Sequence, residues 1–127
     1  MKVKTVGYYK EMPHGVNSRL SIFDYIGIED KKLIEKICNY LDEGITFIVS
    51  PGTVGDVINP ENGIAGETST YTDGEWLWPG DLSYYVRKYR LKLPKEFIES
   101  MEKKNWKVGI SFEDLDYEEV VIDGIKY

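Results

Sequence analysis

The sequence predicts an α+β fold, in which a mainly antiparallel sheet carries about three helices within a single domain spanning residues 1–127. Three observations support this prediction. The dipeptides Asp73-Gly74 and Asp123-Gly124 stand between residues that favour strands, which is the strongest short-range signal for a β-hairpin. Three segments space their apolar residues at helical intervals. The predicted strand pairs are joined too tightly for the crossovers that a parallel sheet requires.

The N-terminal part alternates predicted strands with one clear helix. Residues 2–9 alternate weakly between polar and apolar types and predict a first strand, whereas residues 19–27 fit either a short helix or an irregular apolar segment. Residues 29–43 predict a helix, because they carry an apolar stripe and begin with acids, which the helix dipole favours. Gly44 then stands where a left-handed residue often ends a helix. The β-branched and aromatic residues 45–49 predict a buried strand.

The next segment leads toward the first hairpin. Residues 54–58 predict a short strand. Residues 59–63, with the sequence Asn-Pro-Glu-Asn-Gly, are dense in turn formers and predict a surface loop. Residues 64–72 then enter the hairpin.

The first Asp-Gly hairpin and the helix after it are predicted to form the core. A two-residue type I′ turn would place Tyr71 opposite Trp76, and strand alternation would put Tyr71, Trp76 and Trp78 on one face. Residues 81–90 predict a helix with an apolar stripe, with Asp81 as the N-cap. The predicted core residues of this unit are Tyr71, Trp76, Trp78, Leu82, Tyr85, Val86 and Tyr89.

The C-terminal part predicts a third helix and closing strands. Pro94 suits the first helical position, and an apolar stripe follows it. Residues 108–112 and 118–122 predict two strands, and the second Asp-Gly turn would pair Ile122 with Ile125.

Composition limits the class of protein. The chain has 127 residues with 42% apolar content and no run of 18 apolar residues, which is typical of one globular domain. The first residues contain no apolar stretch of signal-peptide length, so we expect a cytoplasmic protein. The single cysteine, Cys38, is expected to be buried; a catalytic thiolate would require the single histidine, His14, beside it.

Charge is segregated along the chain, although the net charge is only −6. Residues 37–86 carry eight acids and no lysine or arginine, residues 87–107 carry eight bases against three acids, and residues 108–127 carry six acids against one lysine. An acidic surface would attract a cationic partner and disfavour direct binding of nucleic acid. Alternatively, the acidic loops lie against the basic helices and the charges cancel. The candidate partner-binding acids are Asp56, Glu61, Glu67, Asp73 and Glu75.

No motif of a catalytic, metal or phosphate site is recognisable, so no catalytic residue, metal or cofactor is predicted. One alternative is a small carbohydrate-binding or hydrolytic domain, in which Trp76 and Trp78 stack on a sugar beside the carboxylates of Asp73, Glu75 and Asp81. Another is a homo-oligomeric structural protein with exposed tyrosines at its contacts.

The string TDGEWLWPGDLSYYV at residues 72–86, followed by Tyr89 and by LPKEF at residues 93–97, resembles small bacterial proteins of the immunity-protein type. The Gly-Tyr-Tyr at residues 7–9 and the Gly-Asp-Val-Ile at residues 55–58 fit the same pattern. Such proteins neutralise toxins of polymorphic or contact-dependent systems by binding them. The resemblance implies a non-catalytic protein whose partner is a basic cognate toxin domain, for example a nuclease whose active-site region it occludes. No membrane partner is predicted, because the chain has no run of 18 apolar residues, and the oligomeric state is left open.

Overall fold

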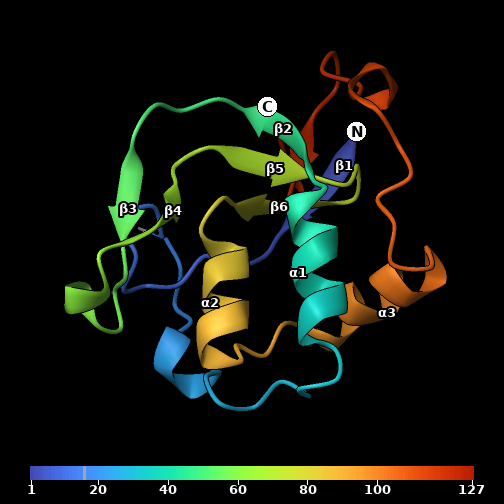
Figure 1. Ribbon diagram of the computed structural model, residues 1–127. Coiled ribbons are helices and arrows are strands. Elements are labelled where there is room, and N and C mark those ends of the chain that lie inside the picture. The colour runs from blue at the N-terminus through green and yellow to red at the C-terminus, as the bar shows by residue number, and fades with distance from the viewer. Residues whose placement is uncertain (16) are drawn as a thin grey trace.

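A six-stranded sheet forms the centre of the protein in the computed structural model, which describes residues 1–15 and 17–127 (Figure 1). Its strand order is β2-β5-β6-β1-β7-β8, and β3 and β4 pair separately. The strands are β1 (Lys2–Thr5), β2 (Ile45–Ile48), β3 (Thr53–Gly55), β4 (Ile64–Glu67), β5 (Thr70–Thr72), β6 (Trp76–Pro79), β7 (Val121–Ile122) and β8 (Ile125–Lys126). The α-helices of the described residues are α1 (Ile34–Asp42), α2 (Leu82–Tyr89) and α3 (Lys95–Lys103). The predicted α+β class is confirmed.

The six-stranded sheet is mixed, with a majority of antiparallel pairs. β1 runs parallel to both of its neighbours, β6 and β7, whereas the pairs β2–β5, β5–β6 and β7–β8 are antiparallel. The first strand of the chain thus lies between two strands that come much later. Because these neighbours are distant in the sequence, the chain between them is long enough to connect parallel strands. No local pattern in the sequence therefore predicted the parallel pairing.

Aromatic side chains fill the space between the sheet and the helices. The ring of Phe97 in α3 lies 4.9 Å from that of Trp76 and 5.6 Å from that of Trp78, and Tyr40 of α1 lies 6.2 Å from Trp78. Aromatic pairs at such distances add about 0.5–1.5 kcal/mol each beyond simple burial. The predicted core residues divide into a buried group, Trp76, Trp78, Leu82, Tyr85 and Val86, and a half-buried pair, Tyr71 and Tyr89.

The first hairpin has a longer loop than predicted. Tyr71 lies opposite Trp78 and Thr72 opposite Leu77, so four residues, 73–76, separate the last paired positions of β5 and β6, and the predicted two-residue turn is wrong. A type I′ turn needs a positive φ at both central positions, but of the two only Gly74 has one, at 93°. The carboxylate of Asp73 instead accepts the last two N–H groups of the loop at 2.9 and 2.8 Å, which stabilises the wider turn. The predicted sharing of faces is unaffected, because the register shifts by two residues.

The second Asp-Gly turn is confirmed. Ile122 pairs with Ile125, and the φ angles of Asp123 and Gly124 are 50° and 83°, as a type I′ turn requires. This hairpin brings the C-terminal residues to the far edge of the sheet from β2.

The first helix begins later than predicted and ends for a different reason. The carboxylate of Asp30 accepts the N–H of Lys32 at 2.9 Å, and this local turn delays α1 until Ile34. Gly44 does not have a positive φ; instead, a Cβ atom there would lie 2.5 Å from the Trp78 ring. The glycine therefore permits close packing of the chain on the sheet. The α-helices have eight or nine residues, and no helix of the described residues is long and apolar enough to span a membrane.

The predicted strand at residues 108–112 is wrong. Gly109 has a φ of 73°, which turns the chain out of an extended path. Ser111 and Asp114 then form a capping box, in which each side chain bonds to the backbone N–H of the other, around the 3-10 helix Phe112–Asp114. The predicted strand at residues 118–122 is present only as the short β7.

Candidate functional site

Asp56, the first candidate acid, is only 2% exposed. The prediction that it belongs to an exposed partner-binding face is therefore wrong. Its carboxylate accepts hydrogen bonds from the hydroxyls of Tyr89 and Tyr84 in α2, at 2.5 and 2.8 Å, and from the amide of Asn62 at 3.1 Å. Burial opposes its ionisation, but these hydrogen bonds and those from the backbone outweigh burial and hold the pKa of Asp56 well below its ordinary range. Asp56 thus ends β3 and ties residues 56–63 to α2.

Asp73 is also buried, at 1% exposure. It accepts a 2.5 Å hydrogen bond from the hydroxyl of Tyr40, and its carboxylate lies 3.7 Å from the ammonium group of Lys104. The same ammonium group lies 3.1 Å from Glu75, which also accepts a hydrogen bond from Ser100. Burial together with the Asp73 carboxylate raises the pKa of Tyr40. A lysine of the basic segment therefore neutralises two candidate acids, as the alternative of charge cancellation predicts.

The five candidate acids do not form one exposed surface. Glu61, in the loop between β3 and β4, and Glu67, at the end of β4, are exposed. Asp56 and Asp73 are buried, and Glu75 is paired with a lysine. Of the acidic face predicted from these loops, Glu61 and Glu67 remain as exposed acids that form no salt bridge within the described residues, and Glu75 is exposed but paired.

The sugar-stacking alternative loses its structural basis. Trp76 and Trp78 have exposures of 8% and 1%, and Phe97 packs against both rings. Neither tryptophan presents a ring face on which a sugar could stack. Asp73 and Asp81, the carboxylates predicted to assist, are buried as well.

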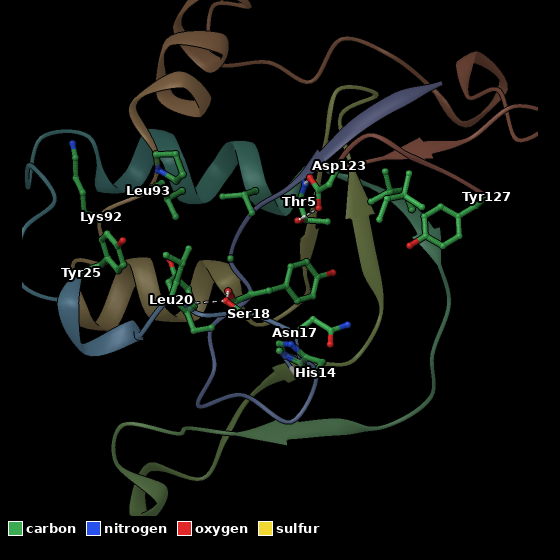
Figure 2. Close-up of a pocket in the computed structure, with 18 residues that line it drawn as sticks. Thr5, His14, Asn17, Ser18, Leu20, Tyr25, Lys92, Leu93, Asp123 and Tyr127 are labelled. Atoms are coloured by element: carbon green, nitrogen blue, oxygen red, sulfur yellow. Dashed lines mark hydrogen bonds between the residues drawn. The ribbon is translucent and has the colours of Figure 1, made fainter.

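A groove of about 560 Å³ lies between the segment that follows β1 and the β7–β8 hairpin (Figure 2). Figure 2 shows Lys92 and Tyr25 toward one end, and Asp123 and Tyr127 toward the other. Both charged groups already have partners. The ammonium group of Lys92 lies 3.3 Å from buried Glu29, and the carboxylate of Asp123 accepts the N–H and hydroxyl of the last residue of β1. The groove therefore offers mostly apolar and tyrosine surface.

His14 lines this groove and pairs with Asp81 rather than with a cysteine. Its Nε2 lies 3.2 Å from Asp81, whose carboxylate does not cap α2 as predicted. Among the described residues, no group hydrogen-bonds to Nδ1 of His14 or to Oδ1 of Asp81. Cys38 is buried in α1 and directs its thiol to the carbonyl of Ser83, and burial raises the pKa of the thiol to about 11. The His14–Asp81 pair thus joins the N-terminal loop to the start of α2. The Cys38 thiol, by contrast, is not activated as a nucleophile.

A second surface was not predicted. Its apolar part, which we call the β2 face, consists of Phe47, Ile48, Val49, Phe112 and Tyr117. The Phe47 and Tyr117 rings stack at 5.1 Å, and Phe112 lies 5.9 Å from Tyr117. Ile48, Val49 and Phe112 have exposures of 53%, 79% and 61%. Such adjoining exposed apolar side chains are typical of binding surfaces.

Acidic residues border the β2 face. Five exposed acids lie between residues 113 and 119, in the segment that carries Tyr117: Glu113, Asp114, Asp116, Glu118 and Glu119. No lysine or arginine within residues 1–15 and 17–127 forms a salt bridge with any of them; the amino group of Met1 lies 3.9 Å from Asp116. The charge count had identified this acidic segment, but nothing local in the sequence predicted that it lies beside residues 47–49.

No protein-family model, curated protein or solved structure matches this chain. The resemblance to immunity-type proteins therefore stays a prediction.

Proposed function

We propose that this chain is a non-catalytic binding protein of the immunity-protein type, which neutralises a cognate basic toxin domain, for example a nuclease, by covering its active-site region. The observation that supports the proposal most directly is the β2 face with its five exposed, lysine-free acids. The resemblance at residues 72–86 supports the class, and the β2 face supports the place of contact.

The composition of this surface fits a standard protein interface. Binding energy in such interfaces concentrates in a few buried aromatic residues, which an outer ring of polar residues shields from water. Phe112 and Tyr117 would be the central contacts, and the acids at 113–119 would form the rim. A stable complex would bury about 1,600 Å² in total, so contacts beyond the β2 face are required.

The acids account for both steering and occlusion. An active site that binds nucleic acid displays lysine and arginine side chains, and clustered carboxylates attract such a site from a distance and increase the association rate. A nuclease domain acts where nucleic acid is present, so the proposal places the complex in the cytoplasm.

The test expresses the C-terminal domain encoded by the reading frame adjacent to the gene of this chain, as the candidate toxin, in cells with and without the chain. We expect survival only when the chain is present. The triple variant Glu113→Gln, Asp116→Asn, Glu118→Gln should slow association at low salt by at least about tenfold, because it removes rim charge without removing contacts.

A matched control changes three acids elsewhere, Glu61→Gln, Glu67→Gln and Glu102→Gln, and makes the net charge of −6 less negative by the same three units. This control includes Glu61 and Glu67, two of the three exposed acids among the five that the sequence predicted. Equal slowing by both variants would mean that only net charge matters. Slowing by the control alone would move the interface to the loops around β4. Failure of the unaltered chain to protect cells would reject the proposed function.

A further inference from the structure

We infer that β2 is a strand-acceptor edge: a lysine- or arginine-bearing extended segment of the partner pairs with its open side and extends the six-stranded sheet. This inference rests on the proposed function and specifies how the partner would bind.

The outer side of β2 is unpaired. β2 is the first strand in the order of the sheet and pairs with β5 on one side only. Phe47 has no partner in β5, and its carbonyl accepts a hydrogen bond from the hydroxyl of Tyr117 at 3.2 Å, which an incoming strand would displace. An open edge of this kind presents backbone donors and acceptors that an incoming strand can pair.

The edge lacks the charged residues that usually protect open strands. Residues 44–55 contain no Lys, Arg, Asp or Glu, and the exposed residues at the end of β2 are Ile48 and Val49. Natural proteins commonly block edge strands with lysine, proline or inward charges. A proline follows only at position 51, so the register shift between Thr46 and Ile48 is the one feature of β2 itself that could twist the edge away from a partner.

The opposite edge of the sheet differs. β8 has only two residues, and one of them is Lys126. A short edge with a lysine is protected in the usual way. The contrast makes β2 the edge that accepts a strand.

The acids near β2 indicate which kind of strand would pair with its open edge. A strand added beyond β2 lies next to Tyr117 and therefore next to the acids at residues 113–119. A second copy of this chain, paired edge to edge through β2, would bring two such acidic segments together, and like charges repel. A cationic segment gains from the same acids. The favoured occupant is thus an extended basic segment of a different protein.

The backbone and side-chain contributions can be separated with a peptide. The probe is a short synthetic peptide in which valine alternates with lysine, so that one face is apolar and the other is cationic. A second peptide has the same side chains, but alternate backbone nitrogens are methylated and cannot donate hydrogen bonds. Binding is measured by fluorescence anisotropy, and the site is located by amide hydrogen exchange.

We expect the first peptide to bind and to slow exchange at residues 45–49, and the methylated peptide to bind at least about tenfold more weakly. Val49→Lys should weaken binding of the first peptide by a similar factor, because it places a charge on the edge. The matched control Ile64→Lys changes another exposed apolar residue, at 65% exposure in β4, and should leave binding unchanged. Both positions are exposed enough that folding should not be affected.

Equal binding of the two peptides, or exchange protection outside residues 45–49, would overturn the inference. Dimers of the free chain that dissociate on Val49→Lys, together with no peptide binding, would assign the edge to a second copy. The two proposals can also fail separately. Toxin neutralisation that depends on the acids, without protection at β2, would retain the proposed function and reject strand addition. Peptide pairing at β2 without toxin neutralisation would retain strand addition and reject the proposed function.

Discussion

The hydroxyl of Tyr89 donates a 2.5 Å hydrogen bond to the carboxylate of Asp56, 33 residues earlier in the chain, and so joins the β3–β4 loop to α2. Asp56→Asn removes the negative charge that accepts this bond. Because hydrogen bonds to buried charged groups are stronger than neutral ones, we expect the free energy of unfolding to fall by about 2 kcal/mol. Urea unfolding measures it. Asp24→Asn, the same change at an exposed position, is the control and should have little effect.

The stabilisation by Asp56 should depend on pH in a defined direction. The pKa of Asp56 is lower in the folded protein than its unfolded value of about 3.9, so its contribution is complete above that value. The contribution is lost as the pH falls toward the folded pKa. The difference in unfolding free energy between the unaltered protein and Asp56→Asn should therefore stay constant down to about pH 5 and shrink below about pH 4. A difference that grows on acidification would contradict the assigned ionisation.

Gly44→Ala should be destabilising because of contact with a ring rather than because of backbone conformation. An added Cβ atom would lie 2.5 Å from the Trp78 ring, which Phe97 holds from another side. Overpacking of this kind costs about 1–3 kcal/mol. The control is Gly55→Ala, where the nearest atom would be 3.6 Å away. Thermal unfolding of both variants distinguishes them, and equal losses would indicate a propensity effect instead.

Signals that act over a few residues predicted much of the fold. The second Asp-Gly turn, Pro94 before α3 and the apolar stripes of the helices are local features, and the structure contains the corresponding turn and helices. The first hairpin was misjudged because the Asp73 side chain competes for backbone N–H groups and widens the loop. The position of β1 between β6 and β7 depends on contacts across more than 70 residues, which no local pattern encodes.

The candidate site was harder to predict, because a charge count does not show whether a carboxylate is exposed. Asp56 is buried because tyrosine hydroxyls 28 and 33 residues later reach it. Glu75 is paired because Lys104, the residue that follows α3, lies beside it. The β2 face depends on the meeting of Phe47 and Tyr117, 70 residues apart. Each outcome is set by the tertiary fold rather than by neighbours in the sequence.

The His14–Asp81 pair should show strong energetic coupling. Asp81 is 1% exposed, and in the described structure His14 is its hydrogen-bonding partner, so His14→Ala leaves a buried carboxylate without compensation. We expect a loss of about 2 kcal/mol for this variant and a smaller additional loss when Asp81→Asn is present as well. A double-mutant cycle by urea unfolding at neutral pH measures the coupling. The exposed pair Lys95–Glu99 is the control and should show much weaker coupling. Additive effects of the two substitutions would contradict the pairing.

Tryptophan accessibility tests the central packing directly. Trp76 and Trp78 are buried, whereas Trp106 is half-buried, so Trp106→Phe leaves only the two core rings as fluorescent reporters. Because Phe97 packs against both rings, acrylamide should quench this variant weakly in the native state and strongly only after unfolding in urea. The unaltered protein, which retains Trp106, should show an additional and more accessible component. Efficient quenching of the native variant would show that a core ring is open to solvent, and it would restore the structural basis for sugar stacking.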